Sequence, residues 1–257
     1  MAEPLLVAKG ITKRFGSVEA LIDVDFDVQA GEVMALVGDN GAGKSTLIKC
    51  IAGIHPIDEG EIRFDAEPVT IHGPKDAARL GIEVVYQDLA LADNLDVVGN
   101  MFLGREQLTS FRRLDETGME ARAQETLKSL SVTTIRSVRQ TVAGLSGGQR
   151  QSVAVAKAVM WNSRVVILDE PTAALGVAQT RQVLDLVGRL GEQGLAVVLI
   201  SHNLHDIFQV ADSITVLRLG QNVAEFKRKE TNQQEVVEAI TAGKLTKVPG
   251  QTEEVVV

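Results

Sequence analysis

Short runs rich in apolar residues, each ending at a glycine or a polar residue, recur along the chain and predict buried β-strands. Such runs are typical of strands that are covered on both faces of a parallel sheet. They occupy residues 32–37, 83–85, 165–168 and 196–200. Strands with one exposed face are predicted at residues 5–7 and 23–28, the second of which alternates apolar and polar side chains. Further strands are expected at residues 60–64 and 213–217.

Helices are predicted between several of these strands. Apolar side chains repeat at spacings of three and four residues, the spacing of one helix face, at Val183, Leu186, Val187 and Leu190. A helix also fits residues 44–52, where Gly53 ends it, and a short final helix contains residues 236–240. Strands that alternate with helices imply a parallel sheet with helices on both faces, so we expect an α/β fold.

The middle of the chain has a different pattern. Between residues 88 and 161 no run predicts a buried strand, whereas residues 118–130 and 146–160 carry helical periodicity. We therefore expect a single domain over residues 1–243, with a helical subdomain at residues 88–161 inserted in its core. Residues 244–257 have little to bury, and we expect them to form a flexible tail.

Composition narrows the class of protein. The 257 residues are 45% hydrophobic and 23% charged, which is ordinary for a globular chain. A net charge of −8 is unfavourable for binding nucleic acid, whose affinity comes largely from neutralising phosphates. No apolar run approaches the roughly 20 residues of a membrane-spanning helix, and the N-terminus does not resemble a secretory signal. Cys50 is the single cysteine and can form no internal disulfide, so we expect a soluble cytosolic protein.

A phosphate-binding loop is predicted between the strand at residues 32–37 and the helix that follows it. The segment Gly38-Asp39-Asn40-Gly41-Ala42-Gly43-Lys44-Ser45 matches the motif G-x-x-x-x-G-K-[ST] in the required strand–loop–helix context. Its glycines let successive backbone N–H groups converge on phosphates, and the helix adds the positive end of its dipole. Lys44 would neutralise the outer phosphates, the Ser45 hydroxyl would ligate Mg²⁺, and Thr46 would donate to the inner phosphate. The chain is therefore predicted to bind a nucleotide.

Polar side chains follow the other predicted core strands. Asp169 and Glu170 end an apolar strand, whose carboxyl end opens onto the crevice of the phosphate loop in a parallel sheet. Asp169 would hold Mg²⁺ through water, and Glu170 would accept a proton from the attacking water. His202 follows the strand at residues 196–200 and is predicted to contact the terminal phosphate. Gln87, at the junction with the helical insert, could reach Mg²⁺ or the attacking water.

A glycine-rich segment identifies the family that these motifs resemble. It reads Leu145-Ser146-Gly147-Gly148-Gln149-Arg150-Gln151 and opens the helix predicted at residues 146–160. With the motifs above, it makes the chain resemble the ATP-binding subunit of an ABC transporter over roughly residues 5–240. The resemblance implies a P-loop NTPase with a mostly parallel sheet, N-terminal antiparallel strands and a helical subdomain.

The same resemblance implies a shared nucleotide site. Ser146, Gly147, Gly148 and Gln149 stand at a helix start as a second anion-binding nest. In the family such a nest contacts the terminal phosphate on a second copy, so two ATP molecules would lie between head-to-tail protomers. Phe15 occupies the place where an aromatic residue usually stacks on adenine. Gly176 replaces the aspartate that is common in the family, which removes a cross-dimer polar contact.

Three segments resemble the ATPases of ribose-, xylose- and fructose-type sugar importers. They are residues 51–55, residues 95–106 and the Ala-Ala-Leu-Gly-Val form at residues 173–177. The resemblance implies an ATP hydrolase that uses Mg²⁺ and drives sugar import through transmembrane permease subunits and, indirectly, a substrate-binding protein. Such ATPases often contain two fused cassettes, whereas this chain has one, so a homodimer at the inner face of the cell membrane is implied.

Two alternatives stay open at this point. One is a soluble ABC ATPase with no role in transport, and the other is the ATPase of a transporter for a different substrate. A nucleotide-gated module that hydrolyses nothing is disfavoured by Glu170 and His202. No nucleic-acid partner is expected from the net charge.

Overall fold

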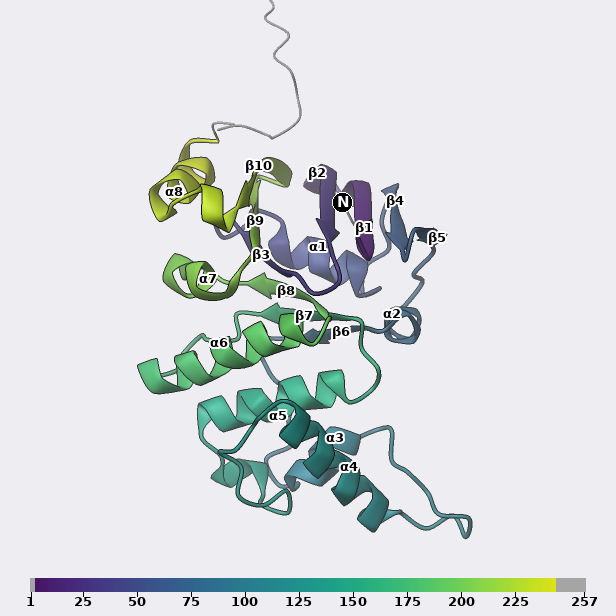
Figure 1. Ribbon diagram of the computed structural model, residues 1–257. Helices are drawn as coiled ribbons and strands as arrows, with labels where there is room; N and C mark the ends of the chain where they lie inside the picture. Colours follow the sequence, from purple (N-terminus) through teal and green to yellow (C-terminus); the bar gives the residue numbers. More distant parts are fainter. Residues whose placement is uncertain (1–2, 244–257) are drawn as a thin grey trace, which may run out of the picture.

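The computed structural model describes residues 3–243 and has at its centre a six-stranded sheet (Figure 1). The strand order is β10-β9-β3-β8-β7-β6, and neighbours are parallel except for β9 and β10. The strands are β3 (Val33–Val37), β6 (Ile82–Val85), β7 (Val165–Asp169), β8 (Ala196–Ile200), β9 (Ser213–Arg218) and β10 (Gln221–Lys227). The parallel sheet predicted from the apolar runs, and the mostly parallel sheet implied by the family resemblance, are therefore confirmed.

Successive residues of the central strands enter two different cores. Val166 and Leu168 of β7 belong to the core on one face of the sheet, whereas Val165 and Ile167 belong to the core on the other face. All five residues of β8 are buried in the same alternating way. Burial on both faces explains why these strands have continuous apolar runs.

Helices cover both faces of the sheet. One core includes apolar side chains of α1 (Lys44–Ile51) and α2 (Pro74–Leu80). The other core includes those of α5 (Gly147–Val159), α6 (Val177–Glu192), α7 (Leu204–Val210) and α8 (Gln233–Ala242).

A second sheet is antiparallel throughout and is formed by strands from the N-terminal part of the chain. Its order is β2-β1-β4-β5, formed by β1 (Leu6–Phe15), β2 (Val18–Val28), β4 (Glu59–Phe64) and β5 (Glu67–Val69). The first two strands are longer than predicted. The register of β1 against β2 shifts between Ala8 and Ile11, and Gly10 there has φ 63°. Such a shift interrupts the alternation of side chains, which hid the rest of β1 from the sequence pattern.

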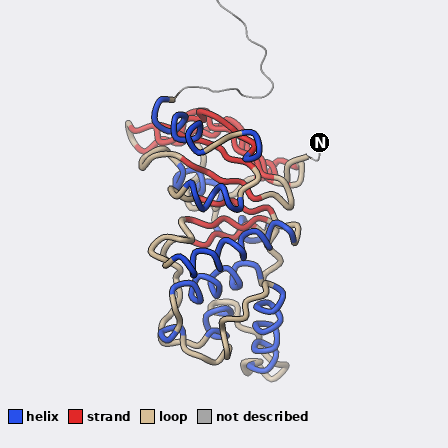
Figure 2. Tube along the Cα trace, turned by 60° about the vertical axis from the view of Figure 1, so that its left-hand side comes forward, coloured by secondary structure: helices blue, strands red, loops and turns tan. Residues whose placement is uncertain are grey.

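The part of the chain between β6 and β7 is helical (Figure 2). It contains α3 (Val97–Phe102), α4 (Glu116–Ser129), the 3-10 turn η1 (Val142–Gly144) and α5. Side chains from α3, α4 and α5 join the same core as those of β3, β7 and β8, so the helices continue the packing of the sheet. The extent of this part as a subdomain, residues 88–161, stays a prediction.

Several elements were not predicted from the sequence: β5, α2, α3, α7, β10 and the 3-10 turns. Each of them is three to seven residues long and lacks the continuous apolar run that marked the equally short strands β3, β7 and β8. The tail expected at residues 244–257 lies outside the described residues. Within residues 3–243, no helix combines the length and the hydropathy that a membrane span requires.

Candidate nucleotide-binding site

Loops that follow four adjacent parallel strands meet at one edge of the central sheet. The phosphate loop follows β3, and His202 follows β8. Asp169 is the last residue of β7, Glu170 comes directly after it, and Gln87 follows β6. Carboxyl ends of parallel strands share an edge, where open α/β sheets bind ligands. One cavity there is lined by Gly38, Asp39, Asn40, Lys44, Ser45, Gln87, Asp169, Glu170, Ala173, Ile200 and His202. The structure thus brings the phosphate loop together with all four residues predicted to act on the bound nucleotide.

The phosphate loop needs its glycines. Gly38, Gly41 and Gly43 have φ values of 147°, 83° and 102°, in the region that side chains rarely adopt. A Cβ atom on Gly38 would lie 2.1 Å from the Leu217 carbonyl oxygen, so no other residue fits there. The backbone therefore turns tightly enough for its N–H groups to converge at the start of α1.

Lys44 lies across this loop. Its Nζ donates to the carbonyl oxygens of Gly38 and Asp39 at 2.6 and 3.0 Å. Burial lowers the pKa of Lys44, while Glu170 and Asp169 act in the opposite direction. A partly desolvated ammonium group of this kind gains most from a bound anion.

Asp169 and Glu170 place two carboxylates beside that ammonium group. Burial raises the pKa of Asp169, and the neighbouring Glu170 raises it further. Asp169, Ser45 and Gln87 line the same cavity and offer only oxygen ligands or a neutral amide. This donor set suits a hard divalent cation such as Mg²⁺.

Glu170 is held from two directions. Its Oε2 lies 2.8 Å from Nδ1 of His202, and its backbone N–H donates to the Ile200 carbonyl at 2.9 Å. Its φ of 51° lies in the left-handed region, which is uncommon for a residue with a side chain. The Glu170 side chain is 17% exposed and the His202 side chain 75% exposed, so the glutamate is fixed in the cavity while the histidine faces outward.

A second hollow also borders the phosphate loop. Residues 40–46, including Thr46, line it together with Val18, Glu19, Ala20, Leu219 and Gly220. The Gly220 N–H donates to the Ala42 carbonyl at 3.1 Å, so the turn between β9 and β10 supports the loop. Sequence reasoning missed this support because it did not predict β10. Gly220, which follows the strand expected at residues 213–217, was the signal that could have indicated a turn.

Phe15 lies at the end of β1 and is not among the residues that line either hollow. The residue is 44% exposed, and its ring packs edge-on against His55, with centroids 5.1 Å apart. Lys13 lies 5.4 Å from the ring centroid and pairs with Asp58 at 2.9 Å. Sequence reasoning gave His55 no role, and no local signal links it to Phe15, because the contact joins separate elements.

The nest at residues 146–149 is also separate from both hollows. Ser146 caps α5: its hydroxyl accepts from the Gln149 N–H at 3.4 Å, while Gln149 Oε1 accepts from the Ser146 N–H at 2.9 Å. Gly147 is exposed, and a Cβ atom there would lie 2.8 Å from Leu175 Cδ2. Within the described chain, the nest and the phosphate loop form two distinct sites.

Comparisons of sequence agree with these motifs. The family described as ABC transporter matches residues 21–173. A fructose import ATP-binding protein of Rhizobium meliloti is 47% identical, over 94% of this chain and 95% of that protein. A xylose/arabinose import ATP-binding protein of Sulfolobus acidocaldarius is 45% identical, over 95% and 96%. A ribose import ATP-binding protein of Clostridium tetani is 38% identical over 95% of this chain, which spans 48% of that longer protein.

Solved structures share the fold. A nucleotide-free ATP-binding cassette from an ABC transporter superposes with a TM-score of 0.80 at 25% identity, covering 93% of this chain and 96% of that one. A dimeric bacterial ABC transporter cassette gives a TM-score of 0.72 at 26% identity, covering 88% and 100%.

Proposed function

This chain belongs to the ABC transporter family, and from that premise we propose that it is the ATP-hydrolysing subunit of a sugar importer. The observation that carries the proposal is the meeting of the phosphate loop, Gln87, Asp169, Glu170 and His202 in one cavity. Two relatives of similar length are named as sugar import ATP-binding proteins, which supports the choice of cargo class.

ATP is the nucleotide that this site binds, and the phosphate loop holds its phosphates. Gly38, Asp39, Asn40, Gly41, Ala42, Gly43, Lys44, Ser45 and Thr46 would surround them. Mg²⁺ would be held by Ser45, Gln87 and Asp169, and when bound it supplies positive charge that offsets the phosphate oxygens. Phe15, braced by His55, would offer a ring face to the adenine base.

Glu170 is the proposed general base. The carboxylate faces the cavity and would accept a proton from the water that attacks the terminal phosphate. His202 fixes the carboxylate through its 2.8 Å contact and would present its other ring nitrogen to that phosphate. Lys44 would stabilise the charge that develops on the phosphate oxygens, so positioning and electrostatics provide most of the catalysis.

A second copy of the chain would complete each site. The nest of Ser146, Gly147, Gly148 and Gln149 is exposed at its outer end and lies apart from its own phosphate loop. A head-to-tail homodimer would place it opposite the terminal phosphate of the partner's ATP. One solved structure similar to this chain is a dimeric cassette in a post-hydrolysis state bound to ADP and phosphate, which supports the formation of a dimer.

The proposed membrane partners would contact a groove between the sheet and the helical part. It is lined among others by Tyr86, Leu103, Arg105, Lys157 and Trp161. Burial lowers the pKa of Lys157, and Leu103 is 45% exposed, so the groove joins an apolar surface to a poorly hydrated cation. Permease subunits seated here would hold the chain at the cytoplasmic face of the membrane, next to the Gln87 loop.

A reconstituted transporter tests the cargo. The chain, its membrane subunits and candidate binding proteins would be placed in proteoliposomes, and phosphate release measured with fructose, xylose and ribose. We expect one sugar and its binding protein to raise ATP turnover several-fold. If no sugar affects hydrolysis but another solute raises it, that solute and not a sugar would be the cargo. Stimulation by DNA or RNA without membrane subunits would contradict a role in transport.

A further inference from the structure

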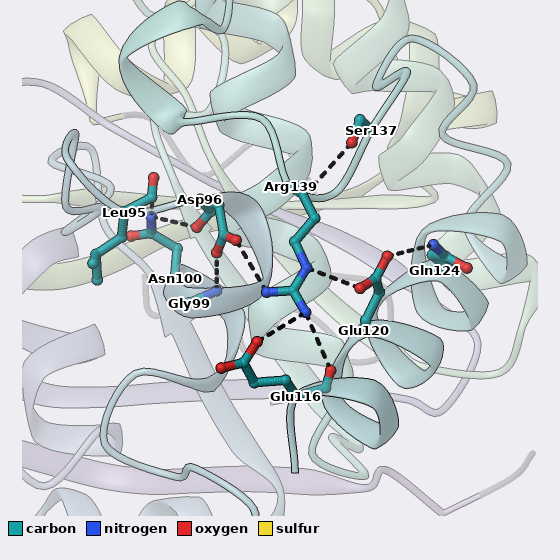
Figure 3. A network of polar contacts seen from close by, with 9 residues as sticks. All are labelled: Leu95, Asp96, Gly99, Asn100, Glu116, Glu120, Gln124, Ser137 and Arg139. Atoms are coloured by element: carbon teal, nitrogen blue, oxygen red, sulfur yellow. Dashed lines mark hydrogen bonds and ion pairs between the residues drawn. The ribbon is translucent and has the colours of Figure 1, made fainter. Parts of the chain in front are cut away.

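Arg139 lies seven residues before Ser146 and connects several parts of the helical region (Figure 3). Its Nε donates to Glu120 Oε2 at 2.8 Å, and its Nη1 donates to Asp96 Oδ2 at 3.4 Å. Its Nη2 lies 3.6 Å from Glu116 Oε2. Asp96 caps α3, whereas Glu116 and Glu120 belong to α4. One guanidinium group thus joins carboxylates from two helices.

The backbone on either side of Arg139 is tied to the start of α3. The Val98 N–H donates to the Val138 carbonyl, and the Val97 N–H donates to the Gln140 carbonyl, both at 3.2 Å. The Asp96 carboxylate also accepts a hydrogen bond from the Gly99 N–H at 2.6 Å, so it is held in place independently of Arg139. Residues 131–139, which we call loop 131–139, lie between α4 and η1. The end of this loop at Arg139 is therefore held by both backbone and side-chain contacts.

The same loop contacts the nest directly. The Thr134 carbonyl accepts from Gln149 Nε2 at 2.6 Å. Oε1 of that amide accepts from the Ser146 N–H, so one side chain links the loop to the first residue of the nest. A shift of loop 131–139 would consequently move Gln149 and change the direction of the nest's N–H groups.

Arg139 supplies the positive charge that neutralises the three carboxylates around it. Without its cation, Asp96, Glu116 and Glu120 would face one another with like charges. The hydrogen bond to Glu120 raises the pKa of Arg139 above its usual value. Exposed ion pairs add little to global stability, so we expect the loss of Arg139 to alter the orientation of the loop more than the folding of the chain.

We propose that Arg139 is a positioning residue, which fixes loop 131–139 and, through Gln149, the nest that is offered to the opposite protomer's ATP. The inference rests on the proposed shared site. It predicts that Arg139 affects the catalytic site of its partner and not the one formed by its own phosphate loop.

A complementation assay with two full-length variants tests this directly. The Ser146→Arg variant has a blocked nest, and the Lys44→Ala variant has a disabled phosphate loop, so neither hydrolyses ATP alone. Mixed dimers regain one site, made from the phosphate loop of the first variant and the nest of the second. Arg139→Gln is then added to one variant at a time, and ATP turnover and KM are measured.

We expect Arg139→Gln to lower kcat about tenfold when it is on the chain that supplies the nest, since small misplacements of a catalytic group are costly. On the chain that supplies the phosphate loop, it should lower kcat less than twofold, and KM for ATP should change in neither case. Arg139→Lys should recover part of the loss, because it keeps the charge but cannot reach three carboxylates at once.

Arg136→Gln is the matched control, because Arg136 is an exposed arginine on the same loop, and it should leave complementation unchanged. An equal loss from either placement of Arg139→Gln would show a general structural role and overturn the inference, as would no loss at all. Failure of the two parent variants to complement each other would instead contradict the proposed shared site.

Discussion

Three features constrain Glu170 at once. Its backbone is left-handed, its N–H is bound to β8, and its carboxylate is in contact with His202. Strained backbone of this kind persists where the surrounding structure determines it, which is common at functional sites. The carboxylate that we propose as the general base is therefore fixed in one position in the cavity.

Replacing this carboxylate should remove turnover and leave binding intact. We predict that Glu170→Gln lowers kcat for ATP hydrolysis at least about 100-fold, as expected for the loss of a general base. The affinity for ATP should change little, because the phosphate loop is untouched. Phosphate release and equilibrium binding of ATP would be measured on the same preparation. Glu192→Gln, at the distant end of α6, is the control. Normal turnover in Glu170→Gln would show that another residue is the general base.

Cys50 should be unreactive in the folded protein. Burial raises the pKa of its thiol from 9.0 to about 11, so at pH 8 the thiolate is about 100-fold rarer than in the unfolded chain. The pKa of this thiol is higher in the folded than in the unfolded chain. Burial of the neutral thiol therefore contributes to the stability of the folded state below about pH 9, and this contribution is lost as the pH rises through about 11. We predict at least a 100-fold slower reaction with iodoacetamide in buffer than in urea, as measured by mass spectrometry. Similar rates would show that α1 opens readily.

At the scale of elements, Asn100 holds α3 to the chain before it. This buried side chain accepts from the Ala92 N–H at 2.7 Å and donates to the carbonyls of Ala92 and Asp96 at 3.0 Å. The short helix α3 could not supply this stability through its own hydrogen bonds.

Asn100→Ala would leave several of these backbone groups buried without partners. We predict a loss of about 2–3 kcal/mol in the free energy of unfolding, measured by urea denaturation. Gln124→Ala, at an exposed position of α4, should change it by less than about 0.5 kcal/mol. A loss below that control value would mean that water replaces the asparagine.

The sequence predicted those elements whose burial leaves a pattern. Both faces of β3, β7 and β8 are covered, so their apolar runs marked them clearly, and the motifs at their carboxyl ends placed the phosphate loop and Glu170 in one site. Contacts between separate elements left no such pattern. The edge contact of Phe15 with His55 and the support of the phosphate loop by Gly220 depend on how strands pack, which spacing along the chain does not reveal.

At the scale of the whole molecule, the two segments that we predict to bind anions lie apart from each other. The phosphate loop lies at the carboxyl edge of the sheet, and the nest lies at the N-terminus of α5 in the helical part. One chain does not join them, whereas two copies in a head-to-tail arrangement would do so twice. ATP would then serve as part of the interface, so closure of the dimer would depend on the nucleotide.

Sedimentation of the Glu170→Gln variant with and without Mg²⁺-ATP tests this account most directly. Without nucleotide we predict a species of 27.6 kDa, and with Mg²⁺-ATP a species of twice that mass, because ATP is bound but not consumed. Adding Ser146→Arg to the variant should abolish the larger species while ATP still binds. A mass that stays at 27.6 kDa in saturating Mg²⁺-ATP, while equilibrium binding shows that ATP is bound, would contradict the shared site.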